Sequence, residues 1–160
     1  MIKYFNHRYL YLFIGILVPA FAFSAPTDYI YPFSSPSYSN YGTIGLIQNP
    51  TARLKEEGTL SLSWSHNEPY LRGSIIAYPF SWMEASYQYT DINNYLYSPS
   101  SAFSGSQSLK DKSFDAKFRL LKETNSLPQV AVGMRDLGGT GLFSAEYIVA
   151  NKFVTQNLDF

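Results

Sequence analysis

Apolar and polar residues alternate with a period of two through most of the chain beyond residue 58. Windows of alternation occupy residues 59–65, 83–90, 114–120, 130–135 and 143–150, and an apolar run covers residues 70–78. Strict alternation is typical of strands that have one polar and one apolar face. The pattern predicts an all-β fold, an antiparallel meander of about six to seven strands, with the seventh beginning at Asn157.

Acidic and basic side chains occupy the polar positions of these windows. They are Glu84, Asp115, Lys117, Arg119, Arg135 and Glu146. In a membrane barrel such residues face a wet lumen and pair across neighbouring strands, whereas in a soluble sandwich the same face meets water. We predict that these six face a lumen. For their role, ion pairing between neighbouring strands is favoured over the lining of a path for a charged polysaccharide.

The predicted connections differ in length. Residues 79–82 and 136–140 form short turns, residues 122–128 a moderate turn, and residues 91–112 a long, Ser-rich connection. Outer-membrane barrels have short periplasmic turns and longer external loops. With a periplasmic N-terminus, the longest connection lies on the external side, and this asymmetry favours a barrel. Alternation alone does not distinguish a barrel from a soluble sandwich.

Composition fits a membrane-interface protein and a Tyr-rich soluble β-sandwich equally well. Aromatic residues make up 18% of the chain, including 14 Tyr, and mean hydropathy is only −0.13. The predicted membrane girdle, favoured over sugar stacking, consists of Trp64, Tyr78, Trp82, Tyr87, Tyr89 and Tyr147. Net charge is zero, so nothing indicates a nucleic-acid partner.

The N-terminus has the organisation of a signal peptide. A basic start with Lys3 and Arg8 precedes an apolar run, and small residues follow at 22–25. The run is shorter than the ~20 residues of a membrane-spanning helix. We predict a signal peptide over residues 1–24, a periplasmic lead-in and plug-like segment over 25–57, and an incomplete transmembrane barrel over 58–160.

The chain has no Cys, which excludes disulfides and thiol catalysis within it and makes a lipoprotein an unfavoured class. No catalytic residue, metal site or cofactor is predicted. His66 is interpreted as a solvated loop residue and not as part of a rim hydrolase. The sequence Gly138-Gly139-Thr140-Gly141 is interpreted as a tight turn, because a phosphate cradle requires a following helix. Arg53 has two open alternatives, an anchor for the plug or a solvated side chain.

Several motifs resemble the YjbH-type exopolysaccharide family, which includes WbfB-type capsule proteins. The first is Gly42-x-x-Gly45-Leu46-Ile47-x-x-Pro50-Thr51-Ala52-Arg53, and the second is Gly138-Gly139-Thr140-Gly141-Leu142-Phe143-Ser144-x-Glu146-Tyr147. Tyr78-Pro79-Phe80-x-Trp82-Met83-Glu84 and Lys112-Ser113-Phe114-Asp115 also match. The resemblance covers roughly residues 40 to 150.

The resemblance implies an outer-membrane barrel that acts without catalysis in exopolysaccharide or capsule production or secretion. The implied partners are outer-membrane lipid, the barrel-insertion machinery, and possible polysaccharide and export components. Family members are several times longer, and six strands are fewer than the ~8 of the smallest barrels, so a truncated product is expected. The alternative is a secreted soluble β-sandwich, an adhesin or carbohydrate-binding module.

Overall fold

The computed structural model describes residues 36–155 and 158–160. The predicted signal peptide, residues 1–24, and the start of the predicted lead-in, residues 25–35, lie outside the described residues.

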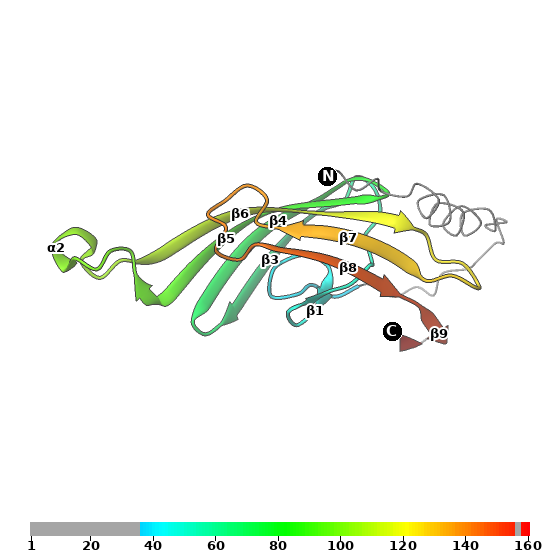
Figure 1. Cartoon of the computed structure of the whole chain (residues 1–160), viewed down its shortest axis with the longest axis horizontal. Helices are drawn as coiled ribbons and strands as arrows, with labels where there is room; N and C mark the ends of the chain where they lie inside the picture. The colour runs from blue at the N-terminus through cyan, green and yellow to red at the C-terminus, as the bar shows by residue number, and fades with distance from the viewer. Residues whose placement is uncertain (1–35, 156–157) are drawn as a thin grey trace, which may run out of the picture. The chain divides into compact units, whose positions relative to one another are not determined.

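Six antiparallel strands form the main sheet in sequence order (Figure 1). They are β3 (Leu60–Asn67), β4 (Tyr70–Phe80), β5 (Met83–Leu96), β6 (Ser108–Leu121), β7 (Gln129–Arg135) and β8 (Ala145–Asn151). The predicted all-β antiparallel meander is therefore confirmed. Within the described part of the chain the sheet is open, with β3 and β8 as its edges.

The remaining elements are short. β1 (Gly45–Leu46) pairs with β2 (Asn49–Pro50), β9 (Phe153–Thr155) pairs with β10 (Leu158–Asp159), and α2 (Ser101–Ser104) lies in the β5–β6 connection. The prediction of a seventh strand in the meander is therefore wrong, because β10 pairs with β9 and not with β8.

Two predicted connections differ from the observed ones. The long connection expected over residues 91–112 spans only 97–107, because β5 and β6 remain paired as far as Leu96 and Ser108. Asp91 and Lys110, opposite each other in this extension, form an ion pair. The β7–β8 connection is longer than expected and covers residues 136–144. The prediction placed Asp91 and Lys110 in a loop because charged residues are common in loops, whereas in the structure they pair across the sheet.

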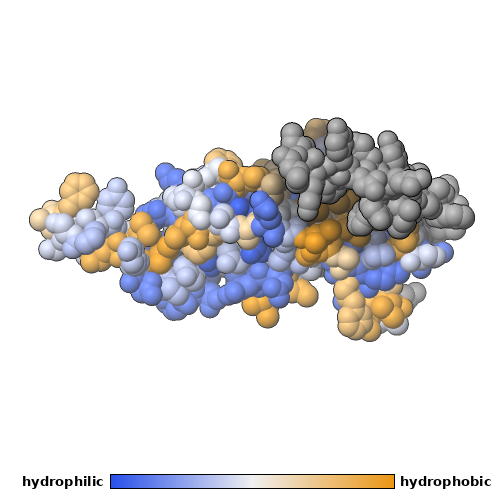
Figure 2. Space-filling model, in the orientation of Figure 1, coloured by the Kyte–Doolittle hydropathy of each residue, from blue (hydrophilic) through white to orange (hydrophobic). Residues whose placement is uncertain are grey.

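The two faces of the sheet have opposite polarity. One face, here called the exposed face, carries large apolar side chains that are open to the surroundings: Leu62 is 77% exposed, Trp64 74% and Ile148 70%. Figure 2 shows hydrophobic residues at the surface along the sheet and at the tip that carries α2. The other face, here called the covered face, buries Arg72, Glu84, Gln88, Asp115 and Lys117. This distribution is the reverse of a water-soluble sheet, which buries its apolar face.

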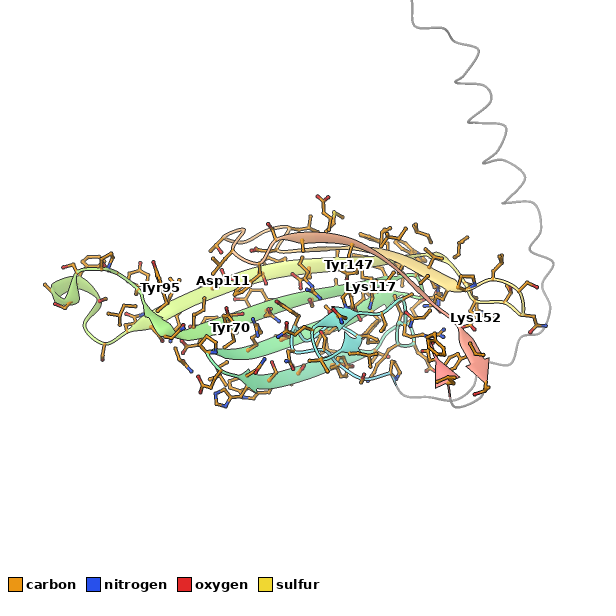
Figure 3. All side chains as sticks on the ribbon, turned by 60° about the horizontal axis from the view of Figure 1, so that its bottom comes forward. Tyr70, Tyr95, Asp111, Lys117, Tyr147 and Lys152 are labelled. Atoms are coloured by element: carbon orange, nitrogen blue, oxygen red, sulfur yellow. The ribbon has the colours of Figure 1, made fainter. Side chains whose placement is uncertain are left out.

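Residues 36–57, here called the N-terminal segment, lie against the covered face (Figures 1 and 3). The buried apolar cluster between them consists of Ile44, Ile76 and Tyr78, with Tyr38 and Leu54 packed against it. Because this cluster is small, polar contacts form most of the interface between the segment and the sheet.

Candidate functional site

A buried ion pair occupies the covered face, formed by Glu84 on β5 and Lys117 directly opposite on β6. Lys117 Nζ lies 3.0 Å from Glu84 Oε1, and both residues are 1% exposed. The pair also holds Ile44: its N–H donates to Glu84 Oε2 at 3.2 Å, and its carbonyl accepts from Lys117 Nζ at 3.3 Å. The Tyr78 hydroxyl donates to Glu84 Oε2 at 2.8 Å. The charges are therefore compensated, as burial requires, and they hold the N-terminal segment.

Two further side chains of the sheet bind the backbone of the same segment. Ser65 Oγ donates to the Asn40 carbonyl at 2.8 Å, and Gln88 Nε2 donates to the Tyr41 carbonyl at 2.5 Å. An irregular segment has few backbone partners of its own, so these side chains satisfy groups that would otherwise be buried without partners.

The Pro50-Thr51-Ala52-Arg53 motif docks the end of the segment. Ala52 is fully buried. Its N–H donates to Asn151 Oδ1 at 2.6 Å, and its carbonyl accepts from Gln129 Nε2. The small side chain of Ala52 allows this close approach of backbone to sheet.

Arg53 extends the docking through its guanidinium. Nη1 donates to Glu123 Oε2 at 2.5 Å, while Nε and Nη2 donate to both carboxylate oxygens of Asp159 at 2.8 and 2.6 Å. The guanidinium also lies 4.2 Å from the centre of the Phe153 ring. Of the two alternatives for Arg53, the structure favours the anchor, because the side chain binds carboxylates and does not face water.

Glu123, in the β6–β7 connection, receives several donors. Besides Arg53, the Phe153 N–H donates to Oε1 at 2.9 Å and Lys152 Nζ lies 3.2 Å away; Figure 3 labels Lys152 at this end of the sheet. Burial would raise the pKa of Glu123, but the hydrogen bonds from Arg53 and Phe153 outweigh it, so the pKa lies below its ordinary value.

This depressed pKa predicts a pH-dependent free energy of unfolding. A carboxylate with a lower pKa in the folded state stabilises the protein above its ordinary pKa, and this contribution disappears as pH falls through the folded pKa. We expect E123Q to lower the free energy of unfolding at pH 7 by about 3 kcal/mol and to weaken its acid dependence below pH 4.5, measured by urea unfolding. E56Q, at an exposed position, should retain the original dependence; equal pH profiles for both variants would contradict the assignment.

Gly42 marks another close approach of the N-terminal segment to the sheet. Its φ is +81°, and a Cβ there would collide with the side chain of Ser74. Both the conformation and the space therefore require glycine.

The Gly138-Gly139-Thr140-Gly141 motif lies within the β7–β8 connection, residues 136–144, and a strand follows it, not the helix that a phosphate cradle requires. The prediction of a tight turn is wrong, because this connection is too long for one. Asp111 Oδ1 accepts from Thr140 Oγ1 at 2.6 Å, and Asp115 Oδ1 accepts from the Asp136 N–H at 2.8 Å. A Cβ at Gly139 would collide with the backbone carbonyl of Lys112. The motif thus fastens the connection onto β6.

A cluster of two arginines and several aromatic rings lies near the same connection. The Tyr41 ring has the Arg72 guanidinium 4.7 Å from its centre and that of Arg135 at 4.0 Å. Arg72 also lies 4.3 Å from the Tyr70 ring and 5.3 Å from the Phe143 ring. These distances are those of cation–π contacts.

Five of the six predicted lumen-facing residues share the covered face: Glu84, Asp115, Lys117, Arg119 and Arg135. Glu146 does not, and the prediction of a common face is wrong for it. Glu146 pairs with Met134 on the exposed face, because Tyr147 takes the covered position opposite Gly133. A Cβ at Gly133 would collide with the Tyr147 ring, which fills the place of the missing side chain.

The predicted girdle residues are divided between the two faces. Trp64, Trp82 and Tyr89 are exposed. Tyr78 is 1% exposed and hydrogen-bonded to Glu84, and Tyr147 lies on the covered face opposite Gly133. The prediction that Tyr78 and Tyr147 belong to an exposed girdle is therefore wrong.

His66 belongs to β3 and not to a loop, which corrects its predicted element. Its side chain is exposed, and Nε2 lies 2.9 Å from Glu68 Oε1. Among residues 36–155 and 158–160, no three His, Asp or Glu side chains are grouped so as to hold a metal ion.

The sequence patterns did not indicate several residues of this interface. They are Arg72, Gln88, Glu123, Gln129, Asn151 and Asp159. Alternating polar residues at 72, 74, 86, 88 and 90 were a usable signal for the first two. The others lie in connections or strand ends and meet residues far away in the chain, as Ala52 and Asn151 do.

No helix in the described ranges has the length and apolar character needed to cross a membrane.

The class defined by the fold is an all-β protein with an antiparallel sheet whose polar face is covered by its own N-terminal segment. The chain belongs to the family described as "Exopolysaccharide biosynthesis protein YbjH", which matches residues 37–160.

A curated relative from Escherichia coli (strain K12), named "Uncharacterized lipoprotein YjbH", is 53% identical over 117 residues, or 73% of this chain. The match spans only 17% of the relative's length. The relative's name runs against the expectation that a lipoprotein is an unfavoured class, an expectation based on the absence of Cys from this chain. No solved structure matches the chain.

Proposed function

We propose that this chain forms part of an outer-membrane β-barrel that acts in exopolysaccharide production or secretion without catalysing a reaction. The observation that carries the proposal is the reversed polarity of the sheet. Leu62, Ile75 and Ile148 are exposed while Glu84 and Lys117 are buried. Barrels in outer membranes have this distribution, because lipid contacts the apolar face and the interior is polar.

The length of three strands supports this placement. A tilted strand crosses a bilayer with about 9–11 residues, and β4 has 11 residues while β5 and β6 have 14 each. The strands β3, β7 and β8 are shorter, with 8, 7 and 7 residues. The open edges β3 and β8 would pair with further strands of a larger barrel, because lipid offers no partner to an unpaired backbone.

The alternative, a soluble β-sandwich, requires the apolar faces to share one core. The apolar cluster among the described residues is small, and the largest apolar surface is exposed. A patch of this kind marks an interaction with a membrane or another protein, which favours the barrel.

The docked N-terminal segment bears on the mode of action. The segment occupies the covered face through the Glu84–Lys117 pair and Arg53. An open sugar path along this face would require the segment to move. The arrangement therefore supports a plug-like role for residues 36–57 and a docking or gated role for the polar face.

Site-specific fluorescence tests the proposal, and the absence of Cys provides a clean background. L62C and I148C place a label on the exposed face, and S126C, in the β6–β7 connection, is the control. In outer-membrane vesicles we expect spin-labelled lipid to quench the first two labels and aqueous iodide to quench the third. Iodide quenching of all three, or recovery of the chain in the soluble periplasm, would overturn the proposal.

A further inference from the structure

We propose that Arg72 and Arg135, with the rings around them, bind the carboxylate of an acidic sugar unit such as a uronic acid. This inference deepens the proposed function by naming a class of ligand. It begins from an unbalanced buried charge: Arg72 is 3% exposed, and its Nε is buried without a hydrogen-bond partner among the described residues. Its contacts in this part of the chain are with aromatic rings.

Arg72 differs from the other buried cations of the covered face. Lys117 is paired with Glu84, and Arg53 is paired with Glu123 and Asp159. No carboxylate of the described residues lies within 4.0 Å of the Arg72 guanidinium. A buried charge that lacks a partner is strongly unfavourable, and a bound anion would supply the missing one.

Arg135 adds a second donor to the same place. Its guanidinium also contacts the Tyr41 ring, 4.0 Å from the ring centre, and its Nη2 donates to the Gln48 carbonyl at 3.1 Å. Its Nε is likewise buried without a hydrogen-bond partner among the described residues. The Asp115 carboxylate is close enough to Arg135 to attract its guanidinium. Two guanidinium groups with free N–H groups match the two oxygens of a carboxylate.

The rings indicate a sugar as the carrier of this carboxylate. Tyr41 and Phe143 pack edge to face at 6.3 Å, and Tyr70 and Phe143 at 5.6 Å; Tyr70 and Tyr147, labelled in Figure 3, come from β4 and β8. Aromatic faces bind the apolar side of a sugar ring, while the arginines select its acid group. Phe143 belongs to the β7–β8 connection, so the ligand would enter from that end of the sheet after its ring moves aside.

The test compares two trisaccharides with the full chain in nonionic detergent. Titration calorimetry should detect binding of trigalacturonate and none of maltotriose, its neutral counterpart. In R72M we expect trigalacturonate affinity to fall at least about tenfold, because a charge-assisted hydrogen-bond pair is lost. K55M removes a different cation that contacts a tyrosine ring, Tyr38, and should leave the affinity unchanged.

Stability separates a binding role from a structural one. If Arg72 serves a ligand, R72M should retain or raise the thermal midpoint, because it removes an uncompensated buried charge. A large fall in that midpoint, equal affinity for both trisaccharides, or unchanged affinity in R72M would each overturn the proposal. Should R72M fail to fold, R72K keeps the charge without the planar fork, and unchanged affinity there would overturn it. Binding in detergent is independent of lipid quenching, so failure here is distinguishable from failure of the proposed function.

Discussion

Replacing Lys117 with Met is expected to lower the free energy of unfolding by about 3–5 kcal/mol, the usual effect of removing one partner of a buried ion pair. The substitution leaves the Glu84 carboxylate buried, with the Tyr78 hydroxyl and the Ile44 N–H as its remaining donors. These neutral donors do not balance the charge. Urea unfolding followed by circular dichroism measures the change.

The double variant K117M/E84Q gives a sharper measurement. With both charges removed, the desolvation penalty disappears, so the double variant should lose less stability than the sum of the two single variants. K112M is the matched control, since Lys112 is an exposed residue of the same strand, and its effect should stay within about 0.5 kcal/mol. Additive effects, or equal losses in K117M and K112M, would contradict a coupled buried pair.

The same substitution should also loosen the N-terminal segment. Met cannot donate the hydrogen bond that Lys117 Nζ gives to the Ile44 carbonyl, and that bond is one of two by which the Glu84–Lys117 pair holds Ile44. Limited proteolysis within residues 36–57 should therefore be faster in K117M than in K112M. The plug-like role of the segment depends on this attachment.

The strands could be predicted from the sequence because side chains of a strand alternate between faces. The alternation gave Glu84, Asp115 and Lys117 a common face without any knowledge of the register. It could not indicate which medium meets the apolar face, because a sandwich and a barrel have the same period of two. That question depends on what covers each face, which is a property of the three-dimensional arrangement.

The error at Glu146 has a local cause. From residue 145 to 150 both positions of the alternation contain apolar residues, so Tyr147 and Ile148 compete for the same face. The register is fixed by the space above Gly133, which accepts the Tyr147 ring. A contact between residues of different strands thus decides the orientation, and no pattern within one strand contains it.

The docking motif illustrates the other limit of sequence reasoning. The resemblance singled out Ala52 and Arg53, yet their roles depend on Asn151 and Asp159, about a hundred residues further along the chain. Loop-closing contacts of this length follow no local periodicity. The residue types alone left an anchor and a solvated arginine as equal alternatives for Arg53.

Placing Arg at Ile75 is expected to destabilise the chain in lipid vesicles by about 2–4 kcal/mol, the cost of a guanidinium at the lipid-facing centre of a barrel strand. Ile75 is 48% exposed and lies opposite Leu62 on β3 and Tyr87 on β5, so it is surrounded by the apolar surface. Urea unfolding from vesicles measures the effect. Q107R, in the connection beyond the ends of β5 and β6, is the control and should be neutral.

I75R distinguishes the two media, because we expect a different change in stability if the exposed face contacts water. An exposed Ile in water can be replaced by Arg with a change within about 0.5 kcal/mol, because the guanidinium stays hydrated. The structure leaves room for the longer side chain, so overpacking does not confuse the result. A neutral I75R would therefore contradict lipid contact at this face, whereas a loss of 2–4 kcal/mol beside a neutral Q107R would mean that the surrounding medium cannot hydrate a charge.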